Sequence, residues 1–137
     1  MAKRNPTKAT LSPSEEALAH SSSGAAYPAE HLSLEELRST ARQLRRDIVT
    51  MIAEAGSGHP GGSLSAVEIL TTLYWKVMRH DPSDPHQADR DRFILSKAHA
   101  CPVLYAVLAQ CDYFPREELW SFRKIDSLLQ GHAHIKT

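Results

Sequence analysis

The sequence predicts an α/β protein that is rich in helices, and three observations lead to this fold class. Apolar residues recur at steps of three and four over residues 34–55 and again over residues 66–77, the period of a helix with a buried face. Residues 93–95, Phe-Ile-Leu, are a short apolar run between polar neighbours and are predicted to form a buried strand. A glycine-rich segment, residues 56–65, lies between the two helical patterns, where a loop on a rigid scaffold can carry a functional site.

Residues 1–31 are rich in Ser, Ala and Pro and show no sustained apolar period, so we predict a disordered N-terminal extension. Such a segment cannot bury enough apolar surface to offset the entropy lost on ordering it. Three basic residues near the start would suit a transit peptide, whereas Glu15 and Glu16 disfavour one because such peptides are poor in acidic residues. Order is expected from residue 32 onward.

The first helix is predicted to begin after Ser33, because Ser33 and Glu36 have the spacing of a capping box. It should end at Gly56, which stands where a glycine C-cap is expected. Its buried stripe consists of Leu34, Leu37, Ala41, Leu44, Ile48, Met51 and Ala55. Four arginines cover much of the other surface, and we expect a solvated face there rather than an anion site: Arg38, Arg42, Arg45 and Arg46.

The glycine-rich segment holds four of the six glycines and places a single histidine, His59, directly before Pro60. Glycine and proline give this backbone conformations that ordinary residues adopt with difficulty, which is how a loop directs a side chain toward a ligand. We therefore predict that His59 is a functional residue. The alternative is a sharp turn in which the histidine is incidental.

The second helix is predicted from a repeated capping-box spacing, Ser65 and Glu68, followed by apolar residues on most sides up to Val77. A helix of this kind belongs inside a larger body, so we expect more protein to pack around it. A loop with two prolines follows at residues 80–85.

Two further histidines follow elements that should end near a ligand. His99 comes just after the predicted strand, and in layered α/β sheets ligands lie outside the carboxyl ends of strands. Alone, it would be an ordinary capping or core residue.

Two more helices are predicted after His99. One covers about residues 102–110, and the other begins at Pro115 and runs to about residue 122. His132 then lies in a segment, residues 128–137, that begins like another ligand loop.

Composition excludes several classes of partner. The 16 Lys and Arg residues balance the 16 Asp and Glu residues, so the chain has no net charge that would favour binding to nucleic acid or to a membrane surface. The apolar runs are too short to span a bilayer, and the N-terminal residues lack the continuous apolar core of a secretory signal peptide. We therefore expect a cytoplasmic protein. The spacing of Cys101 and Cys111 matches neither a redox pair nor a paired zinc motif, which favours reduced thiols.

The eight histidines raise the question of a metal site. His132 and His134 are two residues apart and could share a metal, with His80 or His86 as further ligands. No second tight pair with metal-ligand spacing accompanies them, so we expect no dedicated metal site from these residues.

Taken together, the histidine-bearing segments resemble the N-terminal part of transketolase. The resemblance covers residues 32–132 and rests on residues 56–65, then 91–100, then Phe122-Arg123, then residues 129–132, in the order and spacing of that family. It implies the fold of a thiamine diphosphate-binding domain, here its helix-rich N-terminal part, with an incomplete parallel sheet. Residues 32–137 would then be a partial domain of this type.

The resemblance also implies a chemistry. Members of the family use thiamine diphosphate with Mg²⁺ or Ca²⁺ and transfer a two-carbon ketol unit from a ketose phosphate to an aldose phosphate, in the pentose phosphate pathway. By this resemblance His59 and His132 are catalytic residues that contact the sugar substrate, His59 helps with proton transfer, and His99 lies beside the cofactor. A homologous dimer partner is implied as well.

Two departures from the family pattern stand out. Ala98 replaces a usual glycine, and Ala133-His134 replaces a proline followed by a polar residue. A Gly-Asp-Gly element, which holds metal and diphosphate in the family, does not occur in this sequence, and neither does the glutamate that activates the cofactor. We therefore expect negligible activity from the isolated chain and a requirement for a C-terminal transketolase polypeptide.

Two alternatives stay open. A related thiamine diphosphate enzyme, of the deoxyxylulose-phosphate or dihydroxyacetone synthase type, would keep the cofactor and change the reaction. A non-catalytic remnant would instead bind a transketolase partner without taking part in turnover.

Overall fold

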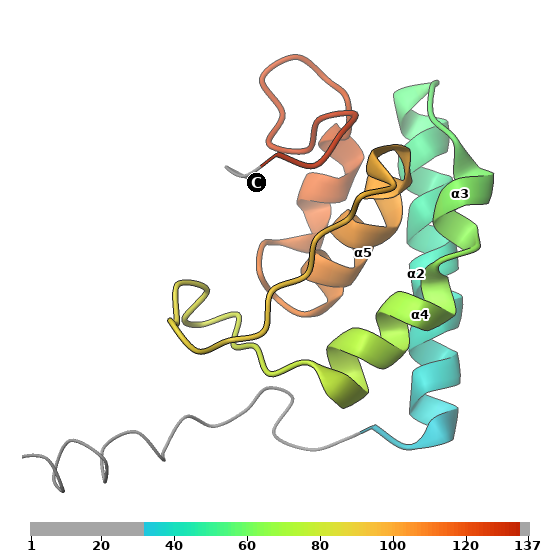
Figure 1. The fold of residues 1–137 in the computed structure, drawn as a ribbon. Coiled ribbons are helices and arrows are strands. Elements are labelled where there is room, and N and C mark those ends of the chain that lie inside the picture. Colours follow the sequence, from blue (N-terminus) through green and yellow to red (C-terminus); the bar gives the residue numbers. More distant parts are fainter. Residues whose placement is uncertain (1–31, 135–137) are drawn as a thin grey trace, which may run out of the picture.

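Helix α2, Leu34–Ala55, is the element against which most of the chain packs. The computed structural model describes residues 32–134, and the predicted extension at residues 1–31 lies outside them. After α2 come α3 (Pro60–Leu64), α4 (Val67–Thr72), the π-helix η2 (Leu73–Val77), the 3₁₀ helix η3 (Ala98–Ala100), α5 (Cys101–Gln110) and the 3₁₀ helix η4 (Arg116–Ser121). Helices α3, α4, α5 and η4 all contact α2, which Figure 1 shows as the long helix along one side.

Both ends of α2 confirm the sequence prediction. The Ser33 hydroxyl accepts a hydrogen bond from the backbone N–H of Glu36, and the Glu36 carboxylate accepts one from the backbone N–H of Ser33 at 2.8 Å. The Ser33 hydroxyl also donates to this carboxylate, at 2.6 Å, and the two bonds that the carboxylate accepts lower the pKa of Glu36. Gly56 ends the helix with φ of 62°, in the left-handed region where glycine is favoured, and its N–H donates to the Ala53 carbonyl.

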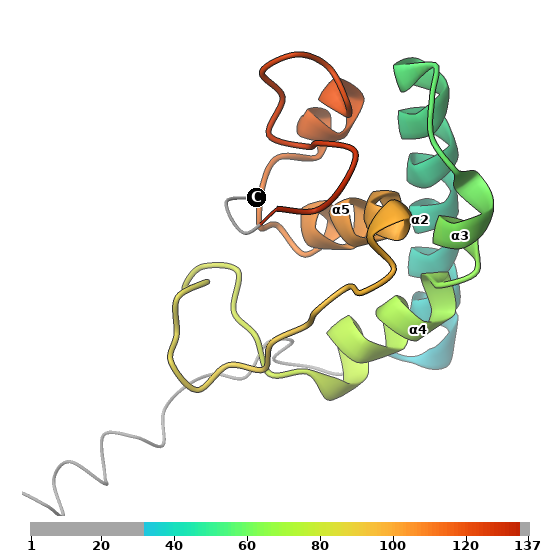
Figure 2. The same ribbon diagram turned by 45° about the horizontal axis from the view of Figure 1, so that its top comes forward.

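The core forms where the middle of α2 meets α5. The central residues of the predicted stripe are buried, whereas Leu34, at its start, is 63 % exposed. Helix α5 is buried on nearly every side, so it lies inside the body between α2 and the later segments (Figures 1 and 2). The fully buried side chains of these two helices include Leu44, Ile48, Met51, Val103, Tyr105 and Val107.

The predicted second helix is present as α4 followed directly by η2, and a further short helix, α3, precedes it, but its predicted capping box is wrong. Pro60 occupies the first turn of α3, so helical structure begins before Ser65 and places that residue at the end of α3. The Ser65 hydroxyl donates to the Gly62 carbonyl at 3.0 Å rather than capping α4. The Glu68 carboxylate pairs with Arg45 of α2, which lowers the pKa of Glu68.

The predicted buried strand at residues 93–95 is also wrong. Residues 32–134 contain no β-strand, and the parallel sheet expected of the α/β class is therefore not observed there. The segment is extended: Phe93 and Leu95 pack half-buried against the core, while Ile94 is 87 % exposed. The physical reason is that a strand needs a partner, and the described part of the chain supplies none.

The last two predicted helices are present. Helix α5 begins one residue before the predicted start, and the helix after Pro115 is of the 3₁₀ type. Arg116, in η4, donates to the buried carboxylate of Asp47 on α2 through Nε, at 3.2 Å from Oδ2, and through Nη2 to Oδ1. Gln43 donates to the same carboxylate at 2.9 Å. This cluster ties η4 to α2.

No helix among the described residues is long and apolar enough to cross a membrane.

Candidate functional site

His59 stands at the junction between α2 and α3. Its backbone is extended, with φ of −120°, and Pro60 begins the helix immediately after it. The imidazole makes no capping hydrogen bond to α3 and is exposed. The short helix therefore fixes the backbone of His59 and leaves its ring exposed.

The structure brings His59 next to His99. The two ring centroids are 6.1 Å apart and the ring planes are inclined by 74°, an edge-to-face arrangement. His99 lies in η3, at the end of the extended segment that leads into α5. Two of the three histidines predicted from the sequence thus share one exposed place, although 39 residues lie between them in the chain.

Gly62 leaves room for the His99 ring beside the backbone of α3. A Cβ atom at position 62 would lie 3.2 Å from Cδ2 and Nε2 of His99 and 3.3 Å from Cε of Lys97. A side chain at position 62 would be tighter than most van der Waals contacts and would push the imidazole and the lysine stem away by a few tenths of an ångström. Sequence reasoning did not single out Lys97. Its position in Ser-Lys-Ala-His, two residues before His99, was the available signal.

A pair of adjacent glycines tests this close approach. Gly62→Ala is expected to displace the His99 ring, because the new methyl group would be closer than ordinary van der Waals contact. Gly61→Ala is the matched control, since a Cβ there meets nothing within 4 Å and both substitutions lie in α3. In NMR spectra the imidazole signals of His99 should shift in Gly62→Ala and stay in place in Gly61→Ala. Equal shifts in both variants would show that the contact is not specific.

Ala98, the departure from the family pattern, causes no backbone strain. It begins the 3₁₀ helix η3 and is not among the residues with positive φ. Glycine is therefore not required at this position by the conformation that the chain adopts.

His132 lies on a loop that is fastened to the start of α5. The Cys101 thiol donates to the Gly131 carbonyl at 3.0 Å, and the Tyr105 hydroxyl donates to the Gln130 carbonyl at 2.9 Å. Burial raises the pKa of Cys101 to about 11, so the thiol keeps its proton as a donor at neutral pH. His132 itself is exposed, and among the described residues no ring contact joins it to His59 or His99.

His80 has a structural role instead of the metal-binding role considered from the sequence. It is buried, with Nε2 2.9 Å from the Tyr74 carbonyl and Nδ1 2.9 Å from the Tyr113 hydroxyl. A carbonyl only accepts, so Nε2 carries the proton and Nδ1 accepts from Tyr113. Within residues 32–134 no group of three or more His, Cys, Asp or Glu side chains is placed to hold a metal ion.

This buried ring predicts a pH dependence. Burial lowers the pKa of His80 in the folded chain, whereas in the unfolded chain a histidine binds its proton near pH 6.5. Below that pH the unfolded state binds more protons than the folded state, so the free energy of unfolding should fall as pH falls from 6.5. Urea unfolding between pH 7 and pH 5 would measure this slope. His80→Gln should reduce the change in unfolding free energy with pH, whereas His86→Gln, at an exposed histidine, should leave it unchanged. If His86→Gln reduced this change and His80→Gln did not, His80 could not be its source.

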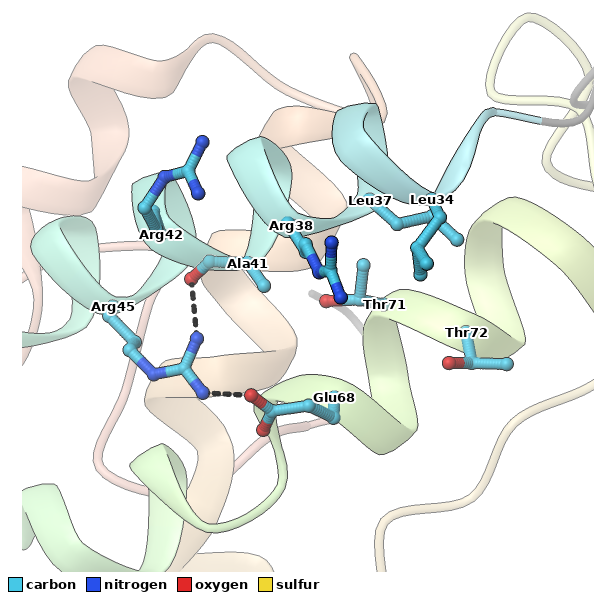
Figure 3. A pocket seen from close by; sticks show the side chains of 9 residues that line it. All are labelled: Leu34, Leu37, Arg38, Ala41, Arg42, Arg45, Glu68, Thr71 and Thr72. Atoms are coloured by element: carbon cyan, nitrogen blue, oxygen red, sulfur yellow. Dashed lines mark hydrogen bonds and ion pairs between the residues drawn. The ribbon is translucent and has the colours of Figure 1, made fainter.

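A separate hollow of about 290 Å³ lies between α2 and α4 and is lined by three of the four arginines (Figure 3). Arg38 and Arg42 both pair with Glu35, at 3.7 and 3.3 Å. Arg45 reaches across to Glu68 and also donates to the Ala41 carbonyl. These guanidinium groups are partly exposed and have carboxylate partners, which agrees with the predicted solvated face.

A family model described as "Transketolase, thiamine diphosphate binding domain" matches residues 34–137. Transketolase from Homo sapiens is 44 % identical over 99 residues, covering 72 % of this chain and 16 % of the human protein. One subunit of the apulose-4-phosphate transketolase of Actinobacillus succinogenes is 42 % identical over 103 residues, which is 74 % of this chain and 37 % of the Actinobacillus polypeptide.

A solved structure agrees with these sequence matches. Transketolase from Leishmania mexicana superposes with a TM-score of 0.67 at 32 % identity, covering 79 % of this chain and 16 % of that one. The chain thus spans 16 % of the human and Leishmania transketolases and 37 % of the Actinobacillus polypeptide.

Proposed function

Because the chain belongs to the transketolase family, in its thiamine diphosphate-binding domain, we propose that it is the N-terminal segment of an enzyme that transfers a two-carbon ketol unit. The donor is a ketose phosphate and the acceptor an aldose phosphate. The observation that carries the proposal is the edge-to-face contact between the His59 ring and the His99 ring, the latter lying against Gly62 of α3. These residues lie in the segments on which the family resemblance rests.

The residues at this place suit thiamine diphosphate better than they suit its metal ion. Two imidazoles and the Lys97 amine offer hydrogen-bond donors to phosphate or hydroxyl oxygens. The described residues contain no cluster of metal ligands, so the ligands of Mg²⁺ or Ca²⁺ would come from outside them. Thiamine diphosphate, when bound, supplies the carbanion chemistry.

The chain's own residues have distinct roles in this proposal. A neutral imidazole accepts at one nitrogen and donates at the other, so His59 binds a sugar hydroxyl and moves its proton. His99 lies against Gly62 and holds the cofactor. His132, on the loop fastened to Cys101, contacts the reacting end of the donor sugar. Lys97, which like His99 approaches Gly62, contributes a positive charge there.

Turnover in this proposal requires protein outside residues 32–134. The partners are a C-terminal transketolase polypeptide and a homologous dimer partner, and the cytoplasm is the proposed location. The similarity to two proteins named as transketolase subunits, from Clostridium and Actinobacillus, supports an enzyme divided between polypeptides.

A chimaera tests the function directly. In human transketolase the matched 99-residue segment is replaced by its counterpart from this chain. With thiamine diphosphate, Mg²⁺, a ketose phosphate and an aldose phosphate, the chimaera should form the ketol-transfer products, while the isolated chain should form none. A chimaera that folds and dimerises but is inactive would support the alternative that this chain is a non-catalytic remnant that binds a transketolase partner. Formation of deoxyxylulose phosphate or dihydroxyacetone in place of ketol transfer would support a related enzyme.

A further inference from the structure

The backbone just before His132 is held by side chains of α5. The Tyr105 hydroxyl donates a hydrogen bond to the Gln130 carbonyl at 2.9 Å. The Cys101 thiol donates to the next carbonyl, that of Gly131, at 3.0 Å. Cys101 and Tyr105 are four residues apart in α5, so both donors lie on one face of the helix. Two consecutive carbonyl groups are therefore fixed by the same element, and the residue that follows them is His132.

A second segment holds the same backbone. The Leu129 carbonyl accepts a hydrogen bond from the backbone N–H of Arg123 at 2.8 Å, and Leu129 itself is fully buried. A Cβ atom at position 131 would lie 3.4 Å from Nε of Arg123, so the arginine side chain lies against Gly131. Residues 129–131 thus each have a hydrogen-bonded carbonyl, whereas the side chain of His132 is exposed.

Cys101 connects this backbone to the segment that carries His99. Helices η3 and α5 follow one another without a break, so His99 and Cys101 are two residues apart in one helical run. Cys101 is fully buried, so its thiol does not face a ligand itself. Figures 1 and 2 show the chain before its C-terminal end, in dark red, passing beside α5. A shift of the Gly131 carbonyl relative to Cys101 would move His132 relative to His99.

We propose that Cys101 is a positioning residue, which sets the place of His132 relative to His99 so that the donor sugar meets the cofactor in a productive geometry. This proposal rests on the proposed function, because it takes the roles of the two histidines from it. A group misplaced by about 1 Å can cost an enzyme roughly 100-fold in rate. A thiol is a weak donor, so the loss of its one bond should cost roughly 3- to 10-fold.

Three variants of the full chain separate positioning from stability. Cys101→Ala removes the donor, whereas Cys101→Ser keeps one, because a hydroxyl can donate to the Gly131 carbonyl. Cys111→Ala is the matched control, since Cys111 is also fully buried and stands at the opposite end of α5. In all three variants the Tyr105 hydroxyl still holds the Gln130 carbonyl, so the loop stays attached and a change should be confined to residues 131 and 132.

Backbone NMR relaxation on the full chain measures how firmly His132 is held, without any catalysis. In the unchanged chain, in Cys101→Ser and in Cys111→Ala, the amides of Gly131 and His132 should have order parameters of about 0.85, the value of rigid backbone. In Cys101→Ala these order parameters should fall below about 0.6, the range of flexible backbone.

The same variants in the chimaera give a kinetic readout. Cys101→Ala should lower kcat/KM for the donor ketose phosphate by roughly 3- to 10-fold. The apparent affinity for thiamine diphosphate should stay unchanged, because His99 keeps its place against Gly62. Cys101→Ser should retain most of the activity and Cys111→Ala all of it. A loss of stability alone would affect Cys101→Ala and Cys111→Ala alike and would lower kcat/KM and cofactor affinity together.

Each of three results would overturn the proposal. The amides of residues 131 and 132 could be mobile in the unchanged chain, they could stay rigid in Cys101→Ala, or Cys101→Ala and Cys111→Ala could have equal effects in the chimaera. If the unchanged chimaera carries out no ketol transfer, the proposed function fails, and the order parameters still decide whether Cys101 holds His132 in place.

Discussion

Replacing Arg116 with alanine is expected to lower the free energy of unfolding by about 2 kcal/mol, because it leaves the buried carboxylate of Asp47 without its charged partner. The carboxylate of Asp47 is 2 % exposed, and in the variant only Gln43 would still donate to it. Because this cluster ties η4 to α2, its loss should destabilise the whole body. Urea unfolding at pH 7, followed by circular dichroism, measures the change.

Two controls accompany this prediction. Arg46→Ala, at an exposed position of α2 with no ion pair among the described residues, should change stability by no more than about 0.5 kcal/mol. Asp47→Leu combined with Arg116→Met should recover much of the loss, because apolar residues can replace a buried pair. A loss below about 1 kcal/mol in Arg116→Ala would contradict the structural role of the pair.

His99→Ala in the chimaera is expected to weaken the apparent affinity for thiamine diphosphate by roughly 10- to 100-fold, the range of a hydrogen bond to a charged group. His99 is held against Gly62 and beside His59, so removing its ring removes the proposed cofactor contact. Steady-state assays over a series of cofactor concentrations measure the effect.

His59→Ala provides the contrast. It should reduce kcat for the ketose and leave the cofactor affinity nearly unchanged, because His59 is proposed to act on the sugar hydroxyls. Gln110→Ala, at the exposed end of α5, should change neither quantity. If His99→Ala and His59→Ala had the same effect on both quantities, the division of roles between them would be wrong.

Local signals predicted the parts of the fold that local interactions determine. The Ser33 and Glu36 capping box and the Gly56 C-cap depend on residues within one turn, and both are present as expected. The Ser65 and Glu68 spacing is identical to that of the first box, yet Arg45 takes the Glu68 carboxylate and Pro60 starts the helix early. A capping box is thus predicted by spacing only where no neighbouring element competes for its side chains.

Long-range features were harder to predict. The apolar run at residues 93–95 has the composition of a strand, but pairing requires a second segment that the described chain lacks. The Asp47 and Arg116 pair joins residues far apart in sequence, and no local pattern indicates it. For the site, the family segments predicted His59 and His99, whereas Lys97 became apparent only through its distance to Gly62.

The central claim is that this chain contributes His59 and His99 to a thiamine diphosphate site that other protein completes. Titration calorimetry with thiamine diphosphate and Mg²⁺ tests it most directly, on the isolated chain, on human transketolase without its matched segment, and on the two mixed. We expect no measurable heat of binding from either component alone and saturable binding from the mixture that His99→Ala weakens. Tight binding by the isolated chain, or equal binding by the mixture with and without the His99 ring, would contradict the claim.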